Sequence, residues 1–574
     1  MQLKRLYFPL ALVSAIACWL VVTTDLLPDQ DNLLAADYGY FLPHLLNGYY
    51  WFLGNGLTVP WFTPAQCAGI PQFANPQSLY YSVPQFLTLL FDPLAAVQMT
   101  FFLFAIIGFC GAWLLAGQLG MTHLVRCFAG FAFMLNGLYL SRMLTGHLSF
   151  HTFMLLPVLL YLLLAGRGRW LFTLLAGLVF AYFIHAGATV VIVPYLVAIA
   201  VMLLFTDADR HAWLRTGLAG LLGLALSLGK LVAALYFNAQ FPRDFYLLPG
   251  AEGPLASIYL AARGLFLPLP DSAASSLIAN TSFTISGTEL NYGVGLVPLV
   301  IIVTGLVIRR PGFTRVRLQP RHLALLVLLL LPVVVNTWWP PLTDLLKRLP
   351  YFQTTTSLFR WYLVYILPVI VIAAMYLQRL PSPWHKPLTI LAIAGLMAGS
   401  LISPPPGETA RPYRPFIIVS AYYAAKSAQE APPVTRVMDS LQDGKRLWLP
   451  GAGDALAGGG SQLACNEPLF GYRLEQFRFN NVFPGSIYAT PEGDFNFYRP
   501  ECFIFPGANR CEAADRFSAS DRARLEAFAG YRPIAFARPM PQRVADLVSL
   551  GALLLLLPGL VITLYREIKK GQHL

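Results

Sequence analysis

ADYGYFLPHL at residues 36–45 and GIPQFANPQSLYY at residues 69–81 lie in one interval, residues 24–97, that separates two apolar segments. The chain has a formal net charge of +12, yet this interval has no Lys or Arg, and its acidic residues are Asp25, Asp29, Asp31, Asp37 and Asp92. Membrane proteins keep Lys and Arg off the loops that cross to the outer side. The sequence therefore predicts that residues 24–97 form an extracytoplasmic loop.

A helix is predicted directly after Asp37. Apolar residues repeat at helical spacing at Phe41, Leu45, Tyr49 and Phe52, with Leu42 and Leu46 beside them. Such a helix has one apolar face and is expected to lie flat on the membrane surface. Asp37 stands at its N-terminus, where unpaired N–H groups and the helix dipole favour a carboxylate. Asp37 is then either a functional carboxylate or only a helix cap.

The composition excludes an ordinary soluble protein. Hydrophobic residues make up 56% of the 574 residues, charged residues make up 12%, and the mean hydropathy is +0.58. We expect an all-α polytopic membrane protein, because about 20 apolar residues cross a hydrocarbon core of about 30 Å. The twelve expected spans are 6–23, 98–117, 127–142, 152–165, 171–185, 187–205, 214–237, 292–308, 322–337, 361–378, 387–403 and 546–565.

The basic loops predict the orientation. Every connection on the side of the termini is basic, from Lys4 and Arg5 to Lys569 and Lys570. This pattern places both termini in the cytoplasm. The first apolar segment lacks a cleavage site, so we expect a retained helix. The net charge is explained by loops that face anionic lipid, and it implies no nucleic acid partner.

Three parts are expected along the chain. Residues 1–404 form a membrane module that includes the loop 24–97, residues 405–545 form an extracytoplasmic domain, and residues 546–574 form the last span with a cytoplasmic tail. The domain at 405–545 is predicted to be a small α+β unit, because its short apolar runs alternate. SASDRARLEAFAG predicts a helix that Ser518 or Ser520 caps and Gly530 ends. GDALAGGGS at 453–461 predicts a flexible loop and not a phosphate-binding loop.

Cysteine positions predict two disulfides. Four of the seven cysteines, Cys67, Cys465, Cys502 and Cys511, lie in the parts expected outside, where disulfides persist. Cys502 and Cys511 are only nine positions apart, and this short interval favours a bridge between them. A second bridge, Cys67–Cys465, would then tie the small domain to the loop 24–97.

Charged residues in or beside the spans are candidates for a site, because an ion at membrane depth normally faces a partner or a wet cavity. Lys230 lies inside LALSLGKLVAALYF, and its alternative role is structural, with its charge reaching the interface. His147 and His151 are four residues apart, so on a continuous helix they share a face. There they could bind a metal or a phosphate, or make ordinary hydrogen bonds.

Four stretches together resemble the GT-C superfamily of membrane glycosyltransferases, and more narrowly its YfhO-like bacterial members. They are ADYGYFLPHL at 36–45, GIPQFANPQSLYYSVP at 69–84, RMLTGH at 142–147 and KLVAALYFNAQFPR at 230–243. The resemblance implies inverting transfer of a sugar from a polyprenyl-phosphate donor to a glycan, lipid or protein acceptor on the outer face, with Asp37 as the base. Many members have a second acidic residue, often linked to a metal, in the next outer loop. This chain has His147 and His151 in that next loop instead. A divalent metal is therefore possible and not required.

The resemblance also suggests roles for the other candidates. Asp37 and His147 are assigned to catalysis. A lipid phosphate at the outer interface needs cations beside apolar helices, and the residues so placed are Lys230, Arg243, Arg360 and Arg142. The candidates for binding the acceptor or the sugar are Asn75, Gln77, His44 and His151.

Two other classes of protein remain open. A transporter or flippase of a lipid-linked or anionic substrate would use Lys230 as a counter-ion, although the two halves of the chain show no duplication. A non-catalytic envelope assembly protein would leave Asp37 dispensable.

The topology can be tested by cysteine labelling. A single cysteine placed at position 315 in a cysteine-free chain is expected to react only after the membrane is permeabilised, because the surrounding loop carries five arginines. A cysteine placed at position 57 is the control and should react in intact cells. Labelling of position 315 from outside would contradict the predicted orientation.

Overall fold

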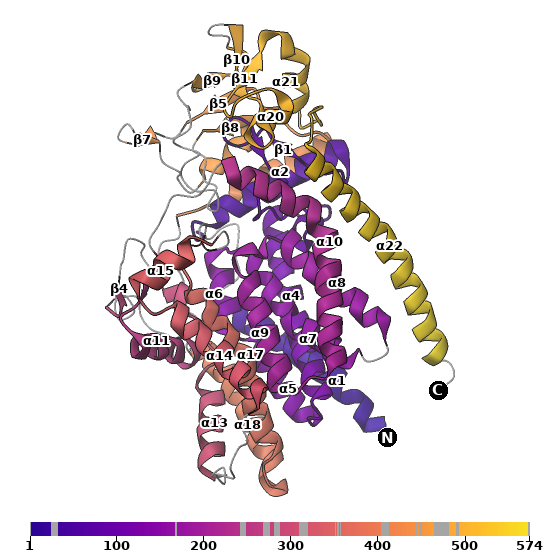
Figure 1. The fold of residues 1–574 in the computed structure, drawn as a ribbon, viewed down its shortest axis with the longest axis vertical. Coiled ribbons are helices and arrows are strands. Elements are labelled where there is room, and N and C mark those ends of the chain that lie inside the picture. The colour runs from indigo at the N-terminus through magenta and orange to yellow at the C-terminus, as the bar shows by residue number, and fades with distance from the viewer. Residues whose placement is uncertain are drawn as a thin grey trace.

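The computed structural model describes residues 2–24, 33–166, 169–240, 248–267, 276–279, 287–308, 319–349, 352, 355, 357–402, 412–439, 441–442, 445–446, 451–463, 481–489 and 493–571. A helical bundle forms most of the molecule, and a smaller domain covers one end of it (Figure 1). The helices of the bundle are α1 (Gln2–Thr23), α4 (Pro93–Gln118), α5 (His123–Met134), α6 (Gly137–Thr145), η1 (Leu148–Leu155), α7 (Leu156–Ala165), α8 (Trp170–His185), η2 (Ala188–Val190), α9 (Ile192–Phe205), α10 (Arg210–Gln240), α13 (Leu296–Ile308), α14 (Pro320–Val335), η4 (Phe359–Tyr365), α17 (Ile366–Gln378), α18 (Ser382–Ile402) and α22 (Met540–Gly571).

The chain is a membrane protein. Within the described residues, 6 helical stretches are long and apolar enough to cross a membrane: Pro93–Gln118, His123–Thr145, Leu148–Ala165, Arg210–Gln240, Phe359–Gln378 and Met540–Lys569. Shorter apolar helices lie at five further expected spans, and the span expected at 387–403 falls on α18. The start of α1 and the end of α22 lie at the end of the bundle away from the smaller domain (Figure 1). The number of crossings and the side of each terminus stay predictions.

Breaks in two of the expected spans shape the site. The span predicted at 127–142 is two helices, α5 and α6, because Asn136 starts a new helix by accepting a hydrogen bond from the Tyr139 N–H at 2.9 Å. The span predicted at 152–165 begins as the 3-10 helix η1 and becomes α-helical only at Leu156. The segment between α6 and η1 is therefore a sharp corner that holds His147.

The loop 24–97 contains α2 (Tyr38–Asn55), β1 (Phe62–Thr63), β2 (Ile70–Pro71) and α3 (Val83–Leu87). α2 is enclosed and does not lie open on the membrane surface as expected. The smaller domain covers its outer side: the Tyr49 ring packs 4.5 Å from the Tyr422 ring, and a Cβ atom on Gly453 would lie 3.0 Å from Pro43. Within the same loop, the Gln85 side chain of α3 donates to the Leu45 carbonyl at 3.0 Å.

The smaller domain mixes helices and short strands. Its described elements are α19 (Phe416–Ala428), β5 (Arg436–Met438), β6 (Leu441–Gln442), β7 (Lys445–Arg446), η5 (Ala452–Gly458), β8 (Gly460–Gln462), β9 (Gly485–Ser486), β10 (Asp494–Tyr498), η9 (Pro500–Phe503), α20 (Pro506–Asn509), β11 (Arg516–Ser518), η10 (Ala519–Asp521) and α21 (Arg522–Ala529). One sheet has the order β8-β5-β9, and β10 pairs with β11. Between the bundle helices lie β3 (Gly250–Ala251), α11 (Pro254–Phe266), β4 (Ile278–Ala279), η3 (Gly287–Leu290) and α15 (Pro340–Lys347).

Two local expectations in this domain need correction. The GDALAGGGS stretch is not a flexible loop: it forms η5 and β8, because the buried Leu456 and Asp454 anchor it against α2 and Tyr413. The expected helix ends at Gly530 as predicted, but Asp521 precedes α21, and Ser518 starts η10 without a side-chain capping bond.

Cys502 and Cys511 form the predicted disulfide. Cys67 is also disulfide-bonded, and its expected partner Cys465 lies outside the described residues. Cys18, Cys110 and Cys127 are free.

Removing the Cys502–Cys511 bridge should destabilise the smaller domain. The pair of substitutions Cys502→Ala and Cys511→Ala is expected to lower its free energy of unfolding by about 2–4 kcal/mol, because the unfolded chain loses a closed loop. Pulse proteolysis of the full chain in urea measures this change, with the free Cys110→Ala as the control. Equal urea midpoints for the double variant and the control would contradict the expectation.

Candidate active site

The Asp37 carboxylate does not cap α2. Asp37 occupies the N-cap position, but its side chain makes no capping hydrogen bond. Instead, one carboxylate oxygen contacts Nε2 of His147. The Asp37 side chain is 38% exposed, so solvent and a ligand can reach it. The geometry thus weighs against the interpretation of Asp37 as only a helix cap.

Gly146 brings His147 to the start of α2. It ends α6 in the left-handed conformation (φ 90°), which turns the chain sharply. A Cβ atom at this position would lie 2.9 Å from the backbone nitrogen of Tyr38. The Tyr38 hydroxyl donates to the Met143 carbonyl at 2.5 Å, so α2 and α6 meet directly. Glycine is required here both by the positive φ and by the close approach.

Arg142 orients the His147 ring. Its Nη1 lies 2.9 Å from Nδ1 of His147. Because a guanidinium can only donate, Nδ1 accepts, and the ring proton is on Nε2, which faces Asp37. Arg142 is 0% exposed, and its Nε and Nη2 atoms have no hydrogen-bond partner among the described residues.

Glu289 joins Arg142 to Arg360. Oε1 of Glu289 lies 3.0 Å from Nη1 of Arg142 and 2.7 Å from Nη2 of Arg360, and its Oε2 lies 3.0 Å from Nε of Arg360. Burial raises the pKa of the Glu289 carboxyl, but the charges of Arg142 and Arg360 together outweigh it and hold the pKa well below its usual range. The carboxylate is therefore ionised at neutral pH.

The segment after Glu289 fixes its position. Gly293 accepts a hydrogen bond from the Gly137 N–H at 2.6 Å, at the start of α6. The Tyr292 hydroxyl donates to the Phe359 carbonyl at 2.5 Å, next to Arg360. Three distant parts of the chain, α6, η3 and η4, thus converge on one carboxylate.

A second polar group lies further along α2. Asp37, Tyr40 and His44 are spaced i, i+3 and i+7, so they share one helix face. The His44 ring packs 4.2 Å from the Tyr40 ring, and its Nε2 lies 3.1 Å from the Gln66 side chain. Burial lowers the pKa of His44 to about 4, so the ring is neutral at pH 7. Asn75 donates to the Tyr40 hydroxyl at 3.3 Å.

Lys230 lies away from the Asp37 cluster. Its Nζ donates to the Ser78 carbonyl at 2.8 Å and to the His185 carbonyl at 3.3 Å, and the residue is 4% exposed. Ser78 ends the turn in which the Asn75 side chain accepts from the Gln77 N–H at 2.8 Å. The contacts of Lys230 thus support the turn that carries Asn75 and Gln77, which favours a structural role, although its charge is buried and does not reach the interface as that alternative expected.

His151 is separated from His147, contrary to the expectation of a shared face. It lies in η1, where three residues complete a turn, so positions four apart point in different directions. His151 is 0% exposed, and its ring nitrogens contact the Leu148 carbonyl at 2.5 Å and the Tyr182 hydroxyl at 2.7 Å. Arg243, one of the four residues expected to bind the donor phosphate, lies outside the described residues.

A metal site is not evident in the part of the chain that the structure describes. There, three candidate ligands converge only at Cys502, Cys511 and Asp515, and the two cysteines are bonded to each other. Asp37 and His147 supply two ligand atoms, fewer than a metal held by protein groups usually needs.

Of the predicted site residues, the structure brings together Asp37, His147, Arg142 and Arg360, and the sequence analysis did not propose Glu289, which joins the two arginines. A signal was present, because two arginines near the ends of spans need a counter-charge and this acid stands seven residues before an apolar helix.

The fold and the site define a membrane protein with a carboxylate–imidazole pair backed by two arginines. No model of a known protein family matches the chain, and no curated protein matches it. Among solved structures, the chain is similar to the arabinofuranosyltransferase AftD from mycobacteria, with a TM-score of 0.43 and 17% identity over 77% of this chain. A mutant of AftD gives a TM-score of 0.42, also with 17% identity, over 75% of this chain. In both comparisons the chain spans 31% of the length of AftD.

Glu289→Gln should destabilise the fold strongly. It leaves the buried Arg142 without its counter-charge, which is expected to lower the free energy of unfolding by about 3–5 kcal/mol. Because the pKa of Glu289 is lowered in the folded state, its stabilising effect is present above the unfolded pKa of about 4.3 and is lost as the pH falls through the folded pKa.

Thermal melting of the purified protein at pH 7 measures this change. Asp494→Asn is the control, because its partner Arg516 lies 3.4 Å away and the Asp494 side chain is 43% exposed, so about 1 kcal/mol or less is expected. Equal melting temperatures for the two variants would show that Glu289 is not essential to the cluster.

Proposed function

We propose that this protein is a GT-C-type glycosyltransferase of the bacterial cytoplasmic membrane, which transfers a sugar from a polyprenyl-phosphate donor to an acceptor on the extracytoplasmic face. The observation that carries the proposal is the pairing of the accessible Asp37 carboxylate with His147, next to Arg360 and Arg142. This cluster combines a base with cations, the two groups that displacement of a phosphate from a sugar requires. The resemblance of four sequence stretches to the superfamily supports the same function.

Asp37 acts as the general base in this proposal. The acceptor hydroxyl gives its proton to the carboxylate as its oxygen forms a bond to the anomeric carbon, and the bond from that carbon to the phosphate oxygen breaks. His147 donates its Nε2–H to Asp37 and so holds the carboxylate in one orientation. Inversion at the anomeric carbon follows from attack opposite to the phosphate.

Arg360 is proposed to hold the donor phosphate. Arg142 and Arg360 carry two positive charges and Glu289 one negative charge, which leaves one positive charge for an anion. The Arg360 side chain is 19% exposed and the Arg142 side chain 1%, so Arg360 is the better placed to meet a ligand. Arg142 then acts on the reaction mainly through His147.

The acceptor or the sugar is proposed to lie along α2. His44 and Asn75 meet at Tyr40, on the face of α2 that also carries Asp37. Neutral hydrogen-bonding groups of this kind suit sugar hydroxyls. Gln77 sits on the same turn as Asn75.

Asp37→Asn tests the base. The variant should fold normally, because Asp37 makes no capping bond that could be lost, while transfer should fall by about 10²- to 10⁴-fold. The assay is transfer by the purified protein from the glycosylated polyprenyl phosphate that accumulates in a strain lacking the gene, with melting temperature measured alongside.

Asp92→Asn is a matched control. Asp92 is a true cap of α4, accepting from the N–H groups of Leu94 and Ala95 at 3.0 and 3.1 Å, and Asn caps equally well. This variant should keep both stability and transfer. An Asp37→Asn variant that is stable and fully active would end the mechanism proposed here.

A further inference from the structure

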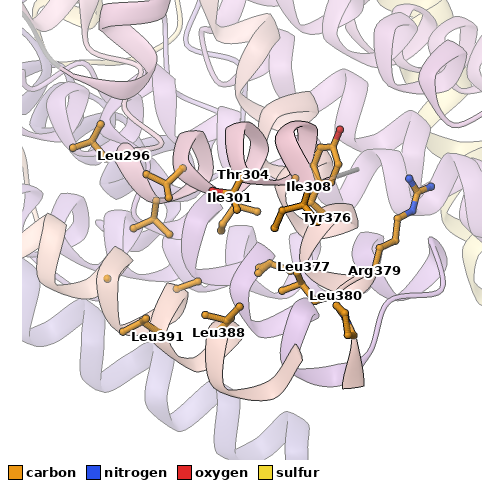
Figure 2. Close-up of a pocket in the computed structure, with 16 residues that line it drawn as sticks. Leu296, Ile301, Thr304, Ile308, Tyr376, Leu377, Arg379, Leu380, Leu388 and Leu391 are labelled. Carbon is orange, nitrogen blue, oxygen red and sulfur yellow. The ribbon is translucent and has the colours of Figure 1, made fainter. Parts of the chain in front are cut away.

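A long apolar cavity runs between α13, α17 and α18 (Figure 2). Its volume is about 450 Å³. Apolar side chains line most of it, among them Leu296, Ile301, Ile308 and Leu391. Arg379 stands at one end, beyond Tyr376 (Figure 2). None of these residues belongs to the Asp37 cluster.

Small residues determine the shape of this cavity. A Cβ atom on Gly305 would run into the Tyr376 ring, so α17 approaches α13 closely at that level. A Cβ atom on Gly395 would lie 3.0 Å from Val297, which brings α18 against the start of α13. Between these two contacts the helices enclose the hollow that Thr304 and Leu391 line.

The cavity is at least as long as one lipid leaflet is thick, and it points away from the candidate active site. α13 has 13 residues, which span about 20 Å at 1.5 Å per residue, and half of a hydrocarbon core of about 30 Å is about 15 Å. α13 starts seven residues after Glu289, and α17 starts six residues after Arg360. Both helices therefore run away from the candidate active site, and Arg379 follows the last residue of α17.

We propose that this cavity binds one acyl chain of an anionic phospholipid from the leaflet on the Arg379 side, with the lipid phosphate at Arg379. The lining offers an alkyl chain apolar contact along its length, and the cation at one end matches an anionic headgroup. A prenyl donor would be oriented the wrong way, because its phosphate would lie at Arg360 and its apolar tail would end against the Arg379 charge. The site is thus separate from the proposed donor site, and only the exclusion of the prenyl donor rests on the proposed function.

Native mass spectrometry of the full chain in detergent tests the proposal. The probes are phosphatidylglycerol and phosphatidylcholine with the same acyl chains. One phosphatidylglycerol should bind per chain about fivefold more tightly than phosphatidylcholine, the effect of one cation near the headgroup. Arg379→Gln should remove this preference. Arg169→Gln is the control: Arg169 is an exposed arginine beside α8 that does not line the cavity, and its substitution should leave the preference unchanged.

Filling the cavity gives an independent test. Thr304→Trp, with Val300→Trp as a second variant, should lower the retention of both lipids at least fivefold while the melting temperature stays within a few degrees. Leu306→Trp is the control, because two residues turn an α-helix by about 200° and Leu306 lies on the other face of α13. Equal binding of the two lipids to the unchanged protein, or full binding to both filled variants, would overturn the proposal. Displacement of the phospholipid by polyprenyl phosphate alone would assign the cavity to the donor instead and would also overturn it.

Discussion

The carboxylate of Glu289 is the constraint on which the rest of the site depends. Arg142 is fully buried, and a guanidinium taken out of water without a counter-charge is strongly unfavourable. Glu289 supplies that charge and also forms a two-bonded contact with Arg360, the geometry in which carboxylate and guanidinium bind most firmly. One side chain thereby holds the ends of two membrane helices at a fixed separation. The orientation of Arg142, and with it that of His147, follows from this contact.

The start of α2 is held from both sides. On the inner side it meets His147 and the Met143 carbonyl. On the outer side, Leu34 exchanges backbone hydrogen bonds with Tyr413, at 2.8 and 3.1 Å. The Tyr413 hydroxyl donates to Asp454 at 3.0 Å, and burial raises the pKa of that carboxyl to about 7. The smaller domain therefore takes part in positioning Asp37, although it lies several hundred residues later in the chain.

Hydropathy predicted where the helical spans lie. Asp37, His147, Arg142 and Arg360 were proposed as site residues from their charge near the ends of spans and from the resemblance of four sequence stretches, and neither signal predicted that they lie together. The contact of Glu289 with Arg142 joins residues 147 positions apart, and no local pattern encodes such a pair. The pairing of His147 with His151 failed because periodicity assumes an α-helix, whereas η1 has a tighter turn. The glycine-rich stretch at 453–461 is ordered by burial against α2, a tertiary effect that overrides local composition.

The charges of the cluster suit the proposed transfer. With His147 neutral, Asp37 and Glu289 carry two negative charges and Arg142 and Arg360 two positive ones, so the cluster is neutral before reaction. A sugar linked to polyprenyl phosphate is a phosphodiester with one negative charge, and its departure creates a phosphate with a second ionisable oxygen. Transfer of the acceptor proton to Asp37 removes one negative charge from the cluster in the same step. The cluster then becomes positive as the leaving phosphate becomes more negative, and such differential stabilisation is what lowers a barrier. Lys230 is fixed on two backbone carbonyls and undergoes no such change, which favours the proposed chemistry at Asp37 over a site in the membrane interior.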